Sequence, residues 1–167
     1  HKKSAKFGEL MTRVYDTFHS HHLIVAMDLG RALCGRIGAS SKHDYYLSAA
    51  FGLVRSALRG HDRVTFIGFS REVRLCIPAS RHIRAFEPLH KGDSRLTPRE
   101  EETDWGCLAA VLPRLAGQRS ILIILTDLSK PSVQEALLAQ LAPVFRKHLT
   151  VVLSLLEKSH ALEERVL

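Results

Sequence analysis

The sequence lacks the segments that would mark a membrane-spanning, secreted or disulfide-bonded protein. No apolar run approaches the roughly 18 to 20 residues that a membrane-spanning helix needs, and no apolar stretch follows the N-terminal His1-Lys2-Lys3, so no signal peptide is indicated. The three cysteines are Cys34, Cys76 and Cys107, and no two form a CxxC pair. We therefore expect free thiols, with Cys76 and Cys107 buried, in a reducing cytoplasmic compartment.

The chain also lacks the common catalytic and nucleotide-binding motifs. Its glycine-containing loop, Gly30 to Gly38, fits neither G-x-G-x-x-G nor G-x-x-x-x-G-K-[ST], and no G-x-S-x-G elbow is present. Cys34 has no histidine placed by the sequence to activate it. His21-His22 has no third ligand at zinc spacing. Nucleotide binding, serine or thiol catalysis and a zinc site are therefore not the leading hypotheses.

The composition is that of a globular domain with a basic surface. The 167 residues are 46% hydrophobic and 25% charged, which is enough to bury a sizeable core. The formal net charge of +7 favours acidic partners, anionic lipid or nucleic acid through long-range attraction. The cations are scattered rather than blocked, and we interpret the densest group as a solvated face. Its members are Arg71, Arg74, Arg81, His82 and Arg84.

Two of the most apolar strand-like runs, 23–27 and 121–126, indicate strands of a parallel sheet covered on both faces. Further strands are expected at 64–69, 73–77 and 149–156, with 73–77 paired as a hairpin to 64–69. An outer strand is expected over 9–18, and the residues from 157 to 167 are expected to be helical or frayed.

Helical periodicity and capping signals alternate with these strands. Ser41 with Asp44 predicts a helix that Gly60 ends, and Ser132 with Glu135 predicts one that runs to about 141, with Pro143 as a kink or stop. A short helix is expected near 83–89 and another at 104–115. Strands that alternate with helices predict a doubly wound α/β fold with a mostly parallel sheet, one antiparallel edge strand and helices on both faces.

We interpret residues 1–167 as a single domain. Residues 1–18 form its N-terminal approach and outer strand, and residues 22–156 form its core. The chain does not begin with Met, and we expect it to be a piece of a longer protein, which can carry a membrane anchor or further domains.

Asp28 and Asp127 come directly after the two most apolar runs, and Thr103 comes just before an expected helix. In a parallel sheet, ligands bind outside the carboxyl ends of the strands, so these three side chains are candidates for one crevice. Carboxylates and hydroxyls suit Mg²⁺, which also keeps several waters. The alternatives are a helix cap for Thr103 and turn or cap roles for the two aspartates.

Several motifs in order resemble one bacterial family. They are Lys3 to Leu10, Ala26 to Arg31, His43 to Ala50, Leu58 to Val64, Thr103-Asp104 and Ile124 to Leu128. Together they resemble the von Willebrand factor A-like domain of a family known only as a domain of unknown function, often encoded beside MoxR-type AAA+ ATPases.

The resemblance implies a Rossmann-like fold with a metal-ion-dependent adhesion site, whose pattern is D-x-S-x-S, then Thr, then Asp. Asp28, Thr103 and Asp127 match this pattern, whereas Gly30 and Ala32 replace the two serines. We therefore expect a degenerate site with at most weak Mg²⁺ binding and no other cofactor. The partner-contacting residues are expected to be Gly30, Arg31 and Asp104.

The leading functional hypothesis is a non-enzymatic protein-interaction domain that acts with a MoxR-type AAA+ ATPase in the assembly or maturation of a complex. One alternative is a metal-assisted hydrolase that uses Asp28, Asp104 and Asp127. Another is a nucleic-acid-binding module driven by the basic charge, whose affinity would fall steeply with salt. Nucleic acid is not the partner that we expect.

Overall fold

The computed structural model describes residues 21–155. The strand expected over 9–18 and the terminal segment 157–167 lie outside these residues.

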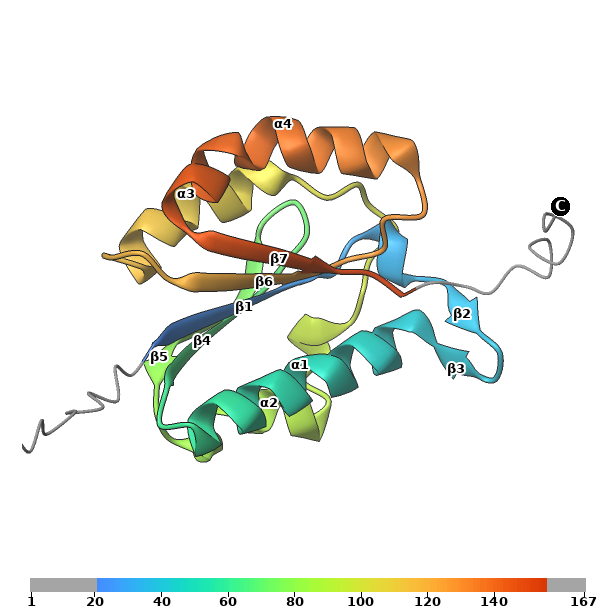
Figure 1. Cartoon of the computed structure of the whole chain (residues 1–167). Coiled ribbons are helices and arrows are strands. Elements are labelled where there is room, and N and C mark those ends of the chain that lie inside the picture. The colour runs from blue at the N-terminus through green and yellow to red at the C-terminus, as the bar shows by residue number, and fades with distance from the viewer. Residues whose placement is uncertain (1–20, 156–167) are drawn as a thin grey trace, which may run out of the picture.

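A five-stranded sheet forms the centre of the domain, in the order β5-β4-β1-β6-β7 (Figure 1). Strand β1 pairs in parallel with β4 and β6, β7 pairs in parallel with β6, and β5 runs antiparallel to β4 at one edge. The predicted fold class is confirmed. The strands are β1 (His22–Asp28), β4 (Arg63–Phe69), β5 (Val73–Ser80), β6 (Ile121–Leu125) and β7 (Leu149–Leu153).

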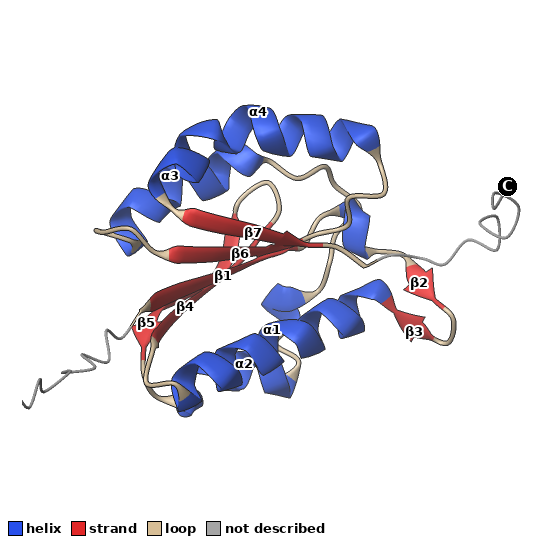
Figure 2. Cartoon of the chain, in the orientation of Figure 1, coloured by secondary structure: helices blue, strands red, loops and turns tan. Residues whose placement is uncertain are grey.

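Helices cover both faces of this sheet (Figure 2). One face carries α1 (Lys42–Arg59) and α2 (Glu87–Lys91), and the other carries α3 (Trp105–Leu115) and α4 (Pro131–Lys147). Within the described residues, no helix is both long and apolar enough to cross a bilayer. The smaller elements are the hairpin of β2 (Arg36–Ile37) and β3 (Ser40–Ser41) and the 3-10 turns Arg31–Leu33, Ile83–Phe86 and Ser94–Leu96.

Strand β1 lies at the centre because its side chains are apolar on both faces. Val25 and Met27 belong to the core under α1, whereas Ile24 and Ala26 belong to the core under α3 and α4. The chain adds β4 and β5 on one side of β1 and then returns to add β6 and β7 on the other. The strand order therefore reverses between β1 and β6, which is where a doubly wound sheet opens a crevice at its carboxyl edge.

Helix α4 differs from its prediction at both ends. It begins at Pro131 with Lys130 as N-cap, because proline at the first helical position is already set for helix and needs no amide donor. It runs past Pro143 to Lys147. The stripe of Leu137, Leu141 and Val144 is buried against the sheet, so packing offsets the lost hydrogen bond at the exposed proline.

Two smaller predictions are also corrected. The N-cap of α3 is Asp104, whose carboxylate accepts a hydrogen bond from the Gly106 amide, and the Thr103 hydroxyl is bonded elsewhere. The three cysteines are free, but Cys76 is exposed and Cys107 only partly buried. Cys76 lies on the edge strand β5 between the buried Leu75 and Ile77, so the period of two places it outward.

The turn after α1 contains the one non-glycine residue with positive φ among the described residues. Gly60 follows the helix with a φ of −77°, and the left-handed residue is His61, with a φ of 62°. The His61 amide donates to the Leu58 carbonyl at 3.1 Å, which closes the turn. A Cβ in this conformation is crowded by its own backbone, so glycine would fit position 61 better than position 60.

We expect His61→Gly to raise the free energy of unfolding by up to about 1 kcal/mol, since relief of the left-handed strain outweighs the added freedom of the unfolded chain. His61→Ala should give no such gain, because it keeps the Cβ. Urea denaturation of both variants beside the parent chain measures the difference. A Gly variant no more stable than the Ala variant would show that position 61 is unstrained.

Candidate functional site

Three side chains that are far apart in the sequence line one pocket at the carboxyl edge of the sheet. Asp28, Thr103 and Asp127 line a cavity of about 340 Å³. In Figure 1, the carboxyl ends of β6 and β7 lie on the side of the sheet nearer the start of α1. Asp28 is the last residue of β1, Asp127 follows β6, and Thr103 precedes α3. The structure therefore brings together the three residues that the sequence predicts to meet.

Asp28 is fully buried, and both of its carboxylate oxygens accept hydrogen bonds from the protein. Oδ1 accepts from the Thr103 hydroxyl at 2.5 Å and from the Gly30 amide at 2.8 Å. Oδ2 accepts from the Thr126 hydroxyl at 2.7 Å. Burial raises the pKa of Asp28, and these three hydrogen bonds act in the opposite direction because they favour the charged form.

Backbone pairing between two loops places Thr103 beside Asp28. The Arg31 amide donates to the Glu101 carbonyl at 2.8 Å, and the Arg99 amide donates to the Leu29 carbonyl at 2.8 Å. The chain then reaches α3, where Asp104 serves as N-cap. Thr103 is thus held over the end of β1, and its hydroxyl is available to Asp28 because the cap role belongs to its neighbour.

Asp127 forms a shielded ion pair with Lys42. Its Oδ2 lies 2.7 Å from the Lys42 ammonium, and the two side chains are only 6% and 14% exposed. Its Oδ1 accepts from the Ser129 amide at 2.8 Å. Burial raises the pKa of Asp127, but the hydrogen bonds from Lys42 and Ser129 outweigh it and hold the pKa below its usual value.

Lys42 is not among the site residues predicted from the sequence. A signal was present, because a cation at the first position of a helix faces the positive end of the helix dipole and needs a nearby anion. One turn later, the Tyr46 hydroxyl donates to the Thr126 carbonyl at 2.9 Å, which fastens the start of α1 to the end of β6. Residues 42 and 46 are four apart and share one face of the helix, so both reach the same strand end.

The residues predicted to contact a partner lie in different places. Arg31 lines the pocket, and its half-exposed side chain pairs with Glu102 at 3.0 Å and Glu100 at 3.9 Å. Gly30 is buried under Thr103. Asp104 is exposed at the start of α3 and does not line the pocket. Whether any of the three binds a partner stays a prediction.

The arranged residues do not fit a hydrated divalent cation. Mg²⁺ requires about six oxygen ligands in near-octahedral geometry, yet all four carboxylate oxygens of Asp28 and Asp127 accept a hydrogen bond from the protein itself. Positions 30 and 32 supply no hydroxyl. Within residues 21–155, no group of three or more His, Cys, Asp or Glu side chains is arranged to hold a metal ion.

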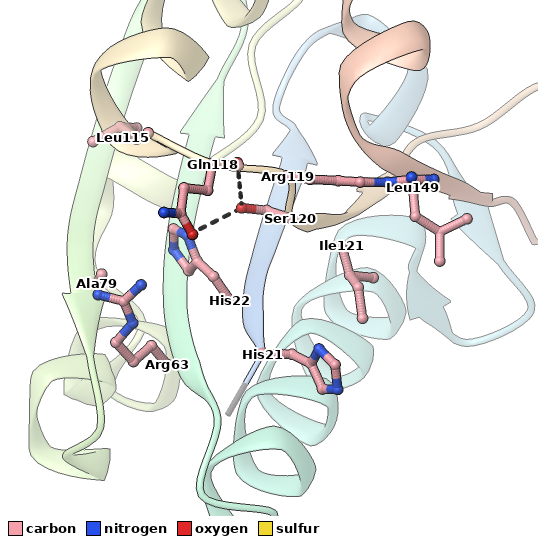
Figure 3. Close-up of a pocket in the computed structure, with 11 residues that line it drawn as sticks. His21, His22, Arg63, Ala79, Leu115, Gln118, Arg119, Ser120, Ile121 and Leu149 are labelled. Atoms are coloured by element: carbon pink, nitrogen blue, oxygen red, sulfur yellow. Dashed lines mark hydrogen bonds between the residues drawn. The ribbon is translucent and has the colours of Figure 1, made fainter. Parts of the chain in front are cut away.

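A larger pocket of about 620 Å³ lies at the opposite edge of the sheet (Figure 3). It contains His21, His22, Arg63 and Arg119 and no acidic residue among those that line it. Figure 3 shows Ser120 between Gln118 and His22, and the Ser120 hydroxyl lies 3.2 Å from His22 Nδ1. This edge is formed by the amino ends of the four parallel strands, so it is distinct from the crevice at Asp28.

The mostly parallel α/β sheet, with aspartates at the ends of β1 and β6 and a threonine before α3, has a von Willebrand factor A-like fold. Two solved structures share the fold. BatB from Bacteroides thetaiotaomicron, a conserved hypothetical protein, is 16% identical with a TM-score of 0.59, and the match covers 81% of this chain and 66% of that one. An aerotolerance-related membrane protein from Bacteroides fragilis NCTC 9343, with multiple mutations to serines, is 15% identical with a TM-score of 0.55, covering 84% and 75%.

The family described as "Protein of unknown function DUF58" matches residues 1–162, and the chain belongs to this family. This confirms the family resemblance found in the sequence. The chain spans just under two thirds of the BatB chain that it matches. No curated protein matches it. At these identities the two solved structures show the fold alone.

Gly30 is needed for the direct contact between Thr103 and Asp28. A Cβ at position 30 would overlap the Thr103 hydroxyl and lie 2.9 Å from the Glu101 carbonyl oxygen. We expect Gly30→Ala to lower the free energy of unfolding by about 1–3 kcal/mol, as overpacking of a buried site does. Thermal and chemical denaturation measure this loss.

Gly52→Ala is the matched control, because a Cβ there meets nothing within 4 Å on the exposed side of α1. In that helix interior, alanine should stabilise by about 0.5–1 kcal/mol. Effects of the same sign at positions 30 and 52 would contradict the close packing at Gly30.

Two histidines near the larger pocket predict a loss of stability in mild acid. Burial lowers the pKa of His22 and of His148, and nearby cations lower both further. As the pH falls below about 6.5, the unfolded chain takes up protons before the folded chain, so unfolding is favoured. The contribution of neutral histidine is therefore complete above about pH 6.5 and decreases below it.

His148→Asn tests this linkage. His148 Nδ1 accepts a hydrogen bond from the Ser120 amide at 3.2 Å, and an asparagine oxygen offers the same acceptor without titrating. Urea midpoints measured between about pH 7.5 and 5.5 should fall less steeply for the variant than for the parent chain. Equal slopes would exclude His148 as a source of the pH dependence.

Proposed function

We propose that this domain is a non-enzymatic protein-interaction module whose contact surface is the rim of the crevice around Asp28, Thr103 and Asp127. One observation carries the proposal. The buried carboxylates are matched by internal donors, whereas the charged groups at the rim are open to solvent. Such a crevice presents a concave, charged surface to a partner, and neither buried carboxylate is available to act as a catalytic base or nucleophile.

The hydrolase alternative finds little support in the positions of the acidic side chains. That hypothesis requires Asp28, Asp104 and Asp127 to converge on one metal, but the Asp104 carboxylate caps α3 and lies outside the pocket lining. Asp28 and Asp127 accept hydrogen bonds on both of their oxygens. A general base must be able to reach the proton of its substrate. The carboxylates of Asp28 and Asp127 are instead engaged by hydrogen-bond donors of the protein.

The rim supplies the groups that a protein partner would contact. Arg31 and Glu102 pair at 3.0 Å with side chains 50% and 69% exposed, and Lys130 is an exposed cation on the same pocket. Exposed ion pairs are worth about 0–1 kcal/mol, so a partner can exchange them for its own contacts at low cost. The basic net charge of +7 favours a partner with an acidic surface.

The partner that we propose is a MoxR-type AAA+ ATPase, with the pair acting in assembly or maturation of a larger complex. The support is membership of the DUF58 family together with the resemblance described above. The cytoplasmic location that such a partner requires is part of the same proposal.

Lys130→Glu tests the rim directly. Lys130 is the N-cap of α4, where a negative charge is favoured by the helix dipole, so the substitution should leave folding intact. We expect it to weaken binding to the purified ATPase at least tenfold, as reversal of a charge opposite an acidic patch does. Isothermal titration calorimetry at two salt concentrations measures the affinity.

Arg119→Glu makes the same charge change at the opposite edge of the sheet, where Arg119 is exposed on the larger pocket. Its affinity should match that of the parent chain. Equal weakening by both variants would indicate nonspecific charge attraction, and no binding by the parent chain would exclude this partner.

A further inference from the structure

The ammonium of Lys42 supplies a positive charge in the same pocket as the three residues that match the adhesion-site pattern. It lies 2.7 Å from Asp127 Oδ2, and Asp127 occupies the last position of that pattern. Lys42, Asp28 and Thr103 line the same pocket. The charge of Asp127 is therefore neutralised by a side chain of the protein itself.

The fold holds this ammonium in place from several sides. The Lys42 amide donates to the Gly35 carbonyl at 2.9 Å, and the lysine stem passes so close to Gly35 that a Cβ there would lie 3.2 Å from Cε. Ser41 caps the helix in front of it, accepting from the Asp44 amide at 3.1 Å. Tyr46 anchors the next turn to the end of β6. The position of Lys42 is thus determined by α1 and its preceding loop.

Protein donors also take the place of ligand contacts at Asp28. The hydroxyls of Thr103 and Thr126 and the amide of Gly30 donate to it, so hydrogens point at the oxygens that a metal would need. A divalent ion in the crevice would have to displace these donors. It would also meet the positive charge of Lys42, and like charges at short distance in a shielded site repel strongly.

We propose that Lys42 is the resident cation of this crevice: it neutralises Asp127 without a divalent ion, and a divalent cation can bind at Asp127 only when the ammonium is removed. It follows that a partner can contact the rim without a metal ion, and this consequence rests on the proposed function. The role of Lys42 in the crevice does not depend on the proposed function.

Mn²⁺ titration of the chain, followed by electron paramagnetic resonance of the free ion, tests the proposal without any partner. Because ten histidines can bind Mn²⁺ elsewhere, the measured quantity is the difference in bound Mn²⁺ between each chain and its Asp127→Asn variant. For the parent chain this difference should be absent. Lys42→Ala should gain Mn²⁺ binding that the double variant Lys42→Ala/Asp127→Asn lacks.

Lys130→Ala is the matched control, since it removes an exposed lysine from the same pocket and should gain no site. Lys42→Met keeps the bulk of the stem and provides a second charge-free variant if the alanine variant does not fold. Asp127-dependent Mn²⁺ binding by the parent chain would overturn the proposal. So would its absence from both folded Lys42 variants.

The parent chain gives an independent readout in its melting temperature. With the ammonium in place, excess MgCl₂ and excess EDTA should give the same value, because an ion that binds only the folded state would raise it. Since no ATPase is present in either measurement, failure of the proposed partner and failure of the proposed cation are separate outcomes.

Discussion

The buried carboxylate of Asp28 is the constraint around which the crevice is built. A charge at the end of a strand that is apolar on both faces has no access to water, and burying it without hydrogen bonds would cost several kcal/mol. Three chain segments satisfy it, through the Gly30 amide, the Thr103 hydroxyl and the Thr126 hydroxyl. The loop after β1, the approach to α3 and the end of β6 are therefore fixed relative to one another.

The absence of the two serines at positions 30 and 32 is part of the same arrangement. Because Gly30 has no side chain, Thr103 can approach Asp28 and donate to it directly. Lys42 then matches the remaining carboxylate, Asp127. The glycine, the threonines and the lysine together form a consistent set of internal partners. The departures from the adhesion-site pattern therefore compensate one another.

Local signals made most of the fold predictable. The strand at His22–Asp28 and the Ser41 cap of α1 follow from hydrophobic period and side-chain chemistry within a few residues. The continuation of α4 past Pro143 depends on burial against the sheet, which local rules do not contain. The pair of Lys42 and Asp127 joins positions 85 residues apart. Sequence reasoning placed Asp127 at the crevice, but only the crossover of α1 brings the ammonium to it.

The two classes of ion pair at the crevice differ in what a partner can change. Removing one member of a buried pair such as Lys42 and Asp127 costs about 3–5 kcal/mol, whereas exposed pairs such as Arg31 and Glu102 are worth at most about 1 kcal/mol. Displacing the buried pair would cost a partner much of its binding free energy, whereas rearranging the exposed pair would cost little. The buried pair therefore stays in place when a partner binds, and the exposed side chains around it determine which partner is bound.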